Sequence, residues 1–69
     1  MSLLPYKQRV IDERDQLSYR LGNLRDFILH NESFAKLPDE DRRLLMEQEK
    51  HMTDYFNTIQ KRLALWGLE

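Results

Sequence analysis

The sequence predicts an all-α fold, an antiparallel two-helix hairpin that assembles with further copies into an oligomeric helical bundle. Apolar residues recur at helical spacing in two segments of nearly equal length, and a break near Pro38 separates the segments. The chain of 69 residues is also too short to cover both outer faces of a hairpin by itself. We therefore expect residues 1–69 to form a single helical-hairpin domain that self-associates.

The first helix is expected over about residues 5–30. Pro5 suits the first helical position, where its missing N–H donor is not needed, and no other proline follows before residue 38. Gly22 lies inside this helix at a cost of about 1 kcal/mol relative to alanine, so it marks either a close approach by another group or a tolerated surface position. The residues that share one apolar stripe are Val10, Leu17, Leu21, Leu24 and Ile28.

A connector over about residues 31–37 and a second helix over about residues 38–66 complete the hairpin. Phe34 and Leu37 suggest one short extra turn within the connector. The second helix opens on Pro38 and three acidic residues, which face the positive end of the helix dipole, and Gly67 is placed to end it. Its apolar stripe consists of Leu45, Met52, Phe56, Ile59, Leu63 and Trp66, with Trp66 expected in the core at the open end of the hairpin.

Further apolar residues lie off or beside the two stripes, so each helix has more apolar surface than one partner helix can cover. A bundle of several chains would use this surface. These residues are Tyr6, Ile11, Tyr19, Leu44, Met46, Tyr55 and Leu65.

Composition narrows the classes of partner. Eleven basic and twelve acidic side chains give a net charge of −1, which argues against duplex nucleic acid as a ligand. The chain has no cysteine, hence neither a disulfide framework nor a thiolate metal site, and an intracellular protein is expected. No signal peptide and no apolar run of about 18 residues is apparent, so we expect a soluble protein without a membrane partner.

The sequence shows no constellation typical of an enzyme. His30 and His51 stand far apart on different helices, without the spacing that puts two metal ligands on one helix face. The acidic residues lie in a charged surface pattern, and two glycines cannot form a phosphate-cradling loop. We expect a protein that is not an enzyme, with no catalytic residue, metal site or cofactor.

The pattern Pro5-Tyr6-x-x-Arg9-Val10-x-x-Glu13-x-x-x-Leu17-x-x-Arg20-Leu21-x-x-Leu24-x-x-Phe27, followed by Phe34-x-x-Leu37-Pro38, resembles a family of very small helical phage proteins. That family includes the type 2 anti-CBASS proteins, which are sponges, typically hexameric, that bind cyclic oligonucleotide second messengers and silence a bacterial antiphage defence. The resemblance implies a homo-oligomer, with a hexamer as the expected form, that binds cyclic di- or trinucleotides in the cytoplasm of an infected bacterial host.

The resemblance also implies ligand contacts. A tyrosine near the start of the first helix and a basic residue about two heptads later match Tyr6 and Arg20, and the motif adds Arg9 and Glu13. Aromatic planes and cations are what the bases and phosphates of a cyclic dinucleotide require. Each residue has a structural alternative: Tyr6 packing near Leu63 or Trp66, Arg20 pairing with Asp12, Glu13 or Gln16, and Arg9 pairing with Glu13.

Helical spacing adds a condition. Fourteen residues return a helix to within about 40° of the same face but advance it by about 21 Å, so Tyr6 and Arg20 can share one small ligand only across neighbouring protomers. Arg62, with Lys61, is a candidate second anionic site, by resemblance to an arginine in the trinucleotide pocket of some family members. The alternative for these two residues is a basic last turn that complements the helix dipole.

Two other functions remain open. The first is a small helical protein-interaction module, an adaptor or inhibitor of a host protein, which would present its outer apolar stripe to a groove on its partner. The second is a structural assembly factor.

Overall fold

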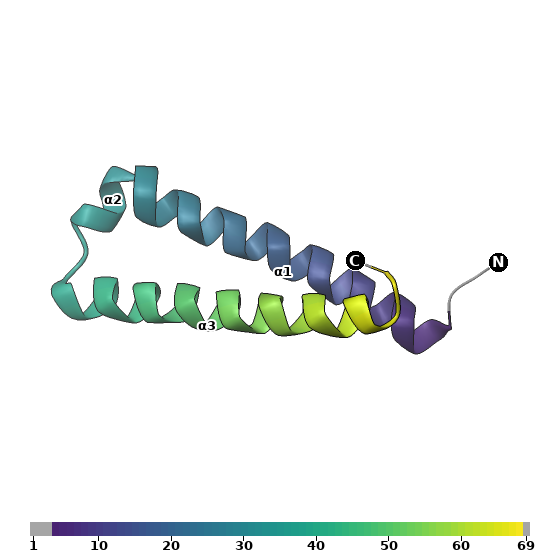
Figure 1. Cartoon of the computed structure of the whole chain (residues 1–69). Coiled ribbons are helices and arrows are strands. Elements are labelled where there is room, and N and C mark those ends of the chain that lie inside the picture. Colours follow the sequence, from purple (N-terminus) through teal and green to yellow (C-terminus); the bar gives the residue numbers. More distant parts are fainter. Residues whose placement is uncertain (1–3, 69) are drawn as a thin grey trace.

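The chain forms a hairpin of two long helices with a short helix at the turn (Figure 1). A computed structural model describes residues 4–68 and contains α1 (Pro5–His30), α2 (Glu32–Ala35) and α3 (Asp39–Leu65). Helices α1 and α3 run antiparallel, and α2 lies at the end of the molecule where they connect (Figure 1). The molecule measures 50 × 16 × 15 Å. The predicted all-helical hairpin is confirmed for these residues, among which no strand occurs.

Local hydrogen bonding explains the connector. Pro5 occupies the first turn of α1, as predicted, and α1 ends at His30. The side chain of Asn31 then accepts a hydrogen bond from the backbone N–H of Ser33 at 2.8 Å, which caps α2. The Phe34 ring packs edge-on against Phe27, with ring centroids 6.0 Å apart. The extra turn predicted within the connector is therefore confirmed as α2.

Helix α3 begins and ends close to the predicted residues. Pro38 is the N-cap, one residue before the helix, and Asp39, Glu40 and Asp41 occupy the first turn. At the other end Gly67 adopts a left-handed φ of 70°. Its N–H donates to the Ala64 carbonyl at 3.0 Å, and the N–H of Leu68 donates to the Leu63 carbonyl at 2.9 Å. This pair of bonds is a Schellman motif, which confirms Gly67 as the residue that ends the helix.

The best-buried core lies in the half of the hairpin away from the connector. Ile59 and Leu63 of α3 are completely buried and pack with Val10 and Leu17 of α1. Ile11, which the sequence pattern placed off the main stripe, instead packs against this core. The other partly buried residues that pack against it are Met52, Phe56, Trp66 and Leu68. The prediction that Trp66 contributes to the core at the open end is thus confirmed.

The connector half is covered less completely. Helices α1 and α3 diverge as they approach α2 (Figure 1). Leu24, Ile28 and Leu45, all members of the predicted stripes, are only half-buried there. Apart from Ile11, the residues predicted to lie outside the two stripes are exposed along both halves: Tyr6, Tyr19, Leu44, Met46, Tyr55 and Leu65.

Gly22 lies on the exposed surface of α1. A Cβ atom added at this position would meet nothing within 4 Å, so no group of the same chain approaches it closely. Within the hairpin, Gly22 is therefore a surface residue.

In the part of the chain that the structure describes, no helix is long and apolar enough to cross a membrane.

Candidate ligand-binding surface

Tyr6 lies at the open end of the hairpin and contacts Trp66. The two ring centroids are 5.6 Å apart with an interplanar angle of 83°, an edge-to-face contact. Tyr6 nevertheless remains 52% exposed. Tyr6 therefore packs against Trp66 of the same chain, as the structural alternative for this residue predicted. About half of its side chain remains accessible to a ligand.

Two cations from different helices also contact the indole. The Lys7 Nζ atom lies 5.3 Å from the centroid of the Trp66 ring, and the Arg62 Cζ atom lies 5.8 Å from it. We refer to Tyr6, Lys7, Arg62 and Trp66 together as the Trp66 cluster. The structure thus brings together Tyr6 and Arg62, which the sequence assigned to separate sites, and adds Lys7, which it did not single out.

The other candidate residues of α1 lie on one flank of the helix. At 100° per residue, Tyr6, Arg9, Glu13 and Arg20 fall within about 60° of one another. Arg9, Glu13 and Arg20 are exposed. Among residues 4–68 these three side chains make neither an ion pair nor a side-chain hydrogen bond, so the pairings considered for Arg9 and Arg20 do not form.

The length of α1 keeps Tyr6 and Arg20 apart. The helix is continuous from Pro5 to His30, so the fourteen residues between the two positions span about 21 Å. A single small ligand cannot contact both residues of one chain. Lys61 is exposed and, unlike its neighbour Arg62, makes no cation–π contact within residues 4–68.

A polar bridge that the sequence reasoning missed joins α1 to α3. The Arg25 Nε atom donates to Glu49 Oε1 at 2.7 Å, and Arg25 Nη2 donates to Thr53 Oγ1 at 2.7 Å. The hydrogen bond from Arg25 is the main reason why the pKa of Glu49 is lowered, and a bond from Thr53 adds to it. The position of Arg25 in the sequence could have predicted this bridge. Arg25 directly follows Leu24 of the apolar stripe, which places it at the edge of the surface where the two helices meet.

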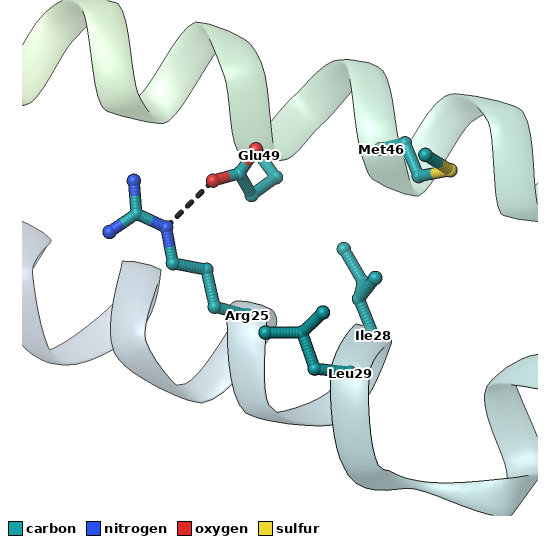
Figure 2. A pocket seen from close by; sticks show the side chains of 5 residues that line it. All are labelled: Arg25, Ile28, Leu29, Met46 and Glu49. Atoms are coloured by element: carbon teal, nitrogen blue, oxygen red, sulfur yellow. Dashed lines mark hydrogen bonds and ion pairs between the residues drawn. The ribbon is translucent and has the colours of Figure 1, made fainter.

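The same bridge borders a shallow hollow between the two helices. Figure 2 shows Arg25 reaching toward Glu49, with Ile28, Leu29 and Met46 completing the lining. The hollow has a volume of about 240 Å³, and its Leu29 and Met46 side chains are largely exposed. Arg25 and Glu49 neutralise each other here, so the lining offers an apolar surface more than a charge.

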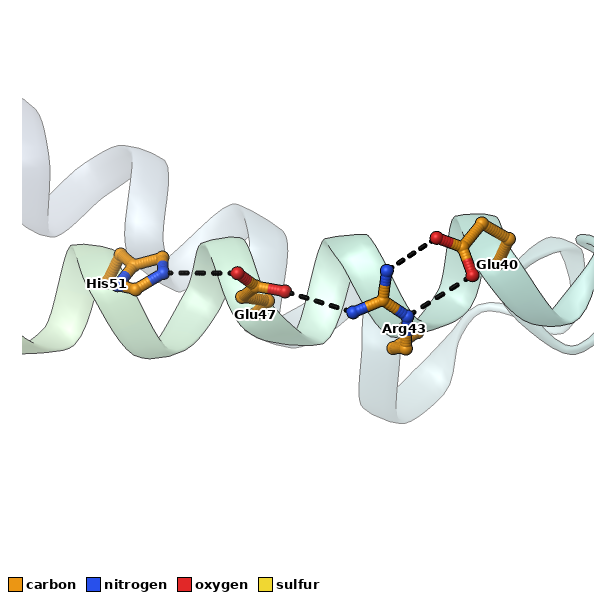
Figure 3. A network of polar contacts seen from close by, with 4 residues as sticks. All are labelled: Glu40, Arg43, Glu47 and His51. Carbon is orange, nitrogen blue, oxygen red and sulfur yellow. Dashed lines mark hydrogen bonds and ion pairs between the residues drawn. The ribbon is translucent and has the colours of Figure 1, made fainter.

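The outer face of α3 carries a chain of surface ion pairs. Arg43 bonds Glu40 and Glu47, and His51 lies 3.5 Å from Glu47 (Figure 3). The hydrogen bond with Glu40 raises the pKa of Arg43, and the nearby charge of Glu47 has the same effect. This chain is a solvated helix face. Within residues 4–68, no three His, Cys, Asp or Glu side chains gather to hold a metal ion.

A second apolar surface follows one side of α3. Two adjoining hollows, of about 450 and 320 Å³, share Leu44 and Gln48. Tyr55 borders one hollow, and Leu37 borders the other. Because Leu44 and Tyr55 are both about half exposed, this groove is available to another helix.

The arrangement therefore offers aromatic rings with nearby cations at one end and apolar surface along the helices, which suits binding. Comparison with known families gives a match to Sequestin over residues 4–65, and the chain belongs to that family. The resemblance seen in the sequence is thereby confirmed, and the family name suggests a sequestering function. No curated protein and no solved structure matches the chain.

Proposed function

We propose that this protein is a sponge that binds cyclic di- or trinucleotide second messengers. It holds them tightly and does not change them chemically. In this proposal Tyr6 stacks on a base, and Arg20 of a neighbouring protomer holds a phosphate. The protein would act in the cytoplasm of a bacterium infected by a phage, where it would deprive a defence system such as CBASS of its signal.

The match to Sequestin over residues 4–65 carries this proposal. The matched segment contains all of α1, with Tyr6, Arg9, Glu13 and Arg20, and all of α3. The exposed Tyr6 ring and Arg20, which makes no ion pair with residues 4–68, supply the two kinds of group that a nucleotide ligand requires.

Assembly is part of the proposal, because Tyr6 and Arg20 of one chain stand too far apart to share a small ligand. The exposed apolar residues of both helices, such as Tyr19, Leu29 and Leu44, supply surface for contacts between copies. We propose a homo-oligomer, with a hexamer as the specific expectation. The basic residues Arg62 and Lys61 remain candidates for a second anionic pocket in such an assembly.

Thermal denaturation with a panel of cyclic di- and trinucleotides tests the function. A ligand at 100 times its Kd stabilises a binding protein by about 2.7 kcal/mol, which raises the Tm of a domain this small by roughly 10–20 °C. Tyr6→Leu and Arg20→Gln should reduce the shift, whereas the matched control Arg43→Gln, at an exposed position of α3, should retain it. If no member of the panel changes the Tm or gives calorimetric heat, the sponge is excluded.

The groove along α3 favours one alternative, a helical protein-interaction module that acts as an adaptor or inhibitor of a host protein. Its half-exposed Leu44 and Tyr55 would contact a helix of the partner. Stoichiometric capture of a host protein that survives Tyr6→Ala and Arg20→Ala but is lost with Leu44→Glu would support this alternative over the sponge.

A further inference from the structure

One long side of α1 lies outside the hairpin core and faces away from Arg20. Positions on this side recur at alternating intervals of four and three residues, which is the heptad pattern of a helix that pairs with another helix. We call them the α1 stripe; its members are Ile11, Asp15, Ser18, Gly22, Arg25 and Leu29. Ile11 is partly buried, the other five are exposed, and Leu29 is 72% exposed. Most of the stripe is therefore open in the single chain.

The order of residue types along the stripe is complementary to itself. From one end to the other the stripe reads apolar, acidic, small, small, basic, apolar. In a second copy laid antiparallel on the first, Ile11 lies opposite Leu29, Asp15 opposite Arg25, and Ser18 opposite Gly22. A two-fold contact repeats each of these pairs. Apolar groups thus meet apolar groups, and each charge meets the opposite charge.

Other registers lose this match. Heptad packing allows the two helices to shift by seven residues. A shift in one direction places Asp15 opposite Ser18 and Gly22 opposite Ile11, and a shift in the other direction places Asp15 opposite Glu32. A parallel pair would set each charge against its own kind. The complementarity therefore selects the antiparallel register in which Ser18 lies opposite Gly22.

The two charged groups of the stripe keep bonding capacity for a second copy. Arg25 uses Nε for Glu49 and Nη2 for Thr53, while its Nη1 donates no hydrogen bond within residues 4–68 (Figure 2). Asp15, whose side chain is 62% exposed, accepts from Arg14 through Oδ1, and its Oδ2 accepts no bond in the same part of the chain. The guanidinium of Arg25 can therefore join Glu49 of its own chain to Asp15 of a second copy.

The middle of the stripe permits a close approach between helices. A Cβ atom added at Gly22 would meet nothing within 4 Å, so no group of the same chain fills this space. Glycine opposite serine lets two helix backbones approach closely, because neither residue has a large side chain. Tyr19, next to Ser18 and 72% exposed, lies beside its counterpart near the two-fold axis of this arrangement.

We propose that the α1 stripe is a two-fold interface between two copies of this chain, with their α1 helices antiparallel and Ser18 of each copy opposite Gly22 of the other. The inference rests on the assembly in the proposed function and deepens it, because it names the surface through which copies pair. Ile11 of each copy then covers the exposed Leu29 of the other. The flank of α1 that carries Arg20 stays outside the contact and remains free for a ligand or for further copies.

Sedimentation velocity without nucleotide, over a range of protein concentrations, tests this interface. Wild-type protein should form dimers or larger even-numbered assemblies. Gly22→Leu has room in its own chain but collides with Ser18 of the second copy, and should weaken association about tenfold or more. Asn23→Leu, at the next exposed residue on a different side of α1, is the matched control and should associate as wild type. Circular dichroism checks that both variants keep their helix content.

A charge exchange supplies the second arm of the experiment. Asp15→Arg and Arg25→Asp should each associate weakly alone, because each variant sets like charges against each other across the contact. An equimolar mixture of the two restores both opposite-charge pairs and should associate more strongly than either variant alone. A merely structural role of Arg25 in its own hairpin would not produce this recovery on mixing.

Cross-linking gives a third readout that needs no change of charge. The chain has no cysteine, so Tyr19→Cys introduces a single thiol close to the proposed two-fold axis. A short bismaleimide should join two such chains into a covalent dimer, whereas Asn23→Cys, on a different side of α1, should react without joining chains.

The outcomes separate this interface from the sponge. If wild-type protein assembles but Gly22→Leu associates equally well, mixing gives no recovery and Tyr19→Cys does not cross-link, the α1 stripe is not the interface, and the sponge stands with its contacts on another face. If the variants behave as expected but no cyclic di- or trinucleotide gives calorimetric heat, the interface stands and the sponge is excluded. A wild-type protein that sediments as a monomer at every concentration overturns the interface.

Discussion

The two halves of the hairpin are built differently. Toward the open end, completely buried Ile59 and Leu63 form a core with α1, and Trp66 covers its edge. Toward the connector, α1 and α3 diverge (Figure 1), and Leu24 and Leu45 are only half-buried. A polar bridge joins Arg25 to Glu49 of α3 there (Figure 2). Leu21, near the middle of α1, is also buried, but the two completely buried side chains both lie in the open half.

The difference assigns separate tasks to the halves. The well-packed open end can hold Tyr6 and its neighbours in fixed positions, which a binding site requires. The connector half leaves Leu29 and Met46 exposed beside a hollow, a surface suited to contact with another copy. In our account one half supplies a binding surface, and the other relies on assembly to complete its core.

Alanine substitutions of two leucines should show the largest difference between the halves. Leu63→Ala removes a completely buried side chain and should cost about 2–5 kcal/mol. Leu45→Ala removes a half-buried one and should cost about 1–2 kcal/mol in dilute protein. Urea denaturation at several protein concentrations measures both free energies.

The concentration dependence sharpens this comparison. If a second copy covers the connector half, the cost of Leu45→Ala should rise with protein concentration toward that of Leu63→Ala, because the side chain is then more deeply buried. Equal costs in dilute protein would contradict the division into two unequal halves.

The two glycines should respond to alanine with opposite signs. Gly67→Ala places a Cβ at a φ of 70° in the Schellman motif and should destabilise the open end by about 1–2 kcal/mol. Gly22→Ala lies in an exposed helix interior with free space around it and should stabilise by about 1 kcal/mol. Thermal denaturation measures both effects. A loss of stability with Gly22→Ala that grows with protein concentration would instead place Gly22 in a contact between copies.

The bridge in the connector half should give the smallest effect, visible in acid. Because the pKa of Glu49 is lowered in the folded chain, its contribution is fully present above the unfolded value of about 4.3 and is lost as pH falls through the lower folded value. Glu49→Gln should therefore remove part of the decline in Tm between about pH 5 and pH 3. Asp26→Asn, which changes a carboxylate without an ion pair among residues 4–68, is the control; an identical acid response in Glu49→Gln and wild type would contradict the role of the bridge.

The fold was largely predictable because its determinants are local. The periodic apolar residues, Pro5, the three acids after Pro38 and Gly67 each act within a turn or two of helix, where spacing in the sequence is also spacing in the structure. Ile11 is the exception: helical period places it beside the main stripe, but in the structure it packs against the core.

The candidate site was less predictable because it depends on how the two helices meet. The predicted antiparallel hairpin already placed Tyr6 and Arg62 at the same end of the molecule. That both contact the Trp66 ring depends on the register between the helices, which the sequence does not reveal. Lys7 was missed for the same reason, and the partners of Arg25 depend on the register between helices. The assignment of Tyr6, Arg9, Glu13 and Arg20 to ligand contacts remains a prediction.

Native mass spectrometry tests the central claim most directly, since it records the assembly and its bound ligand together. The protein is purified from separate bacterial cultures that each make a different cyclic di- or trinucleotide. If the protein is a sponge, we expect a homo-oligomer that carries one or more bound cyclic nucleotides, so that its mass exceeds the summed mass of its chains by a multiple of the mass of that nucleotide. The Tyr6→Leu variant should lose this excess mass. A protein that emerges from every culture without bound nucleotide would contradict the account.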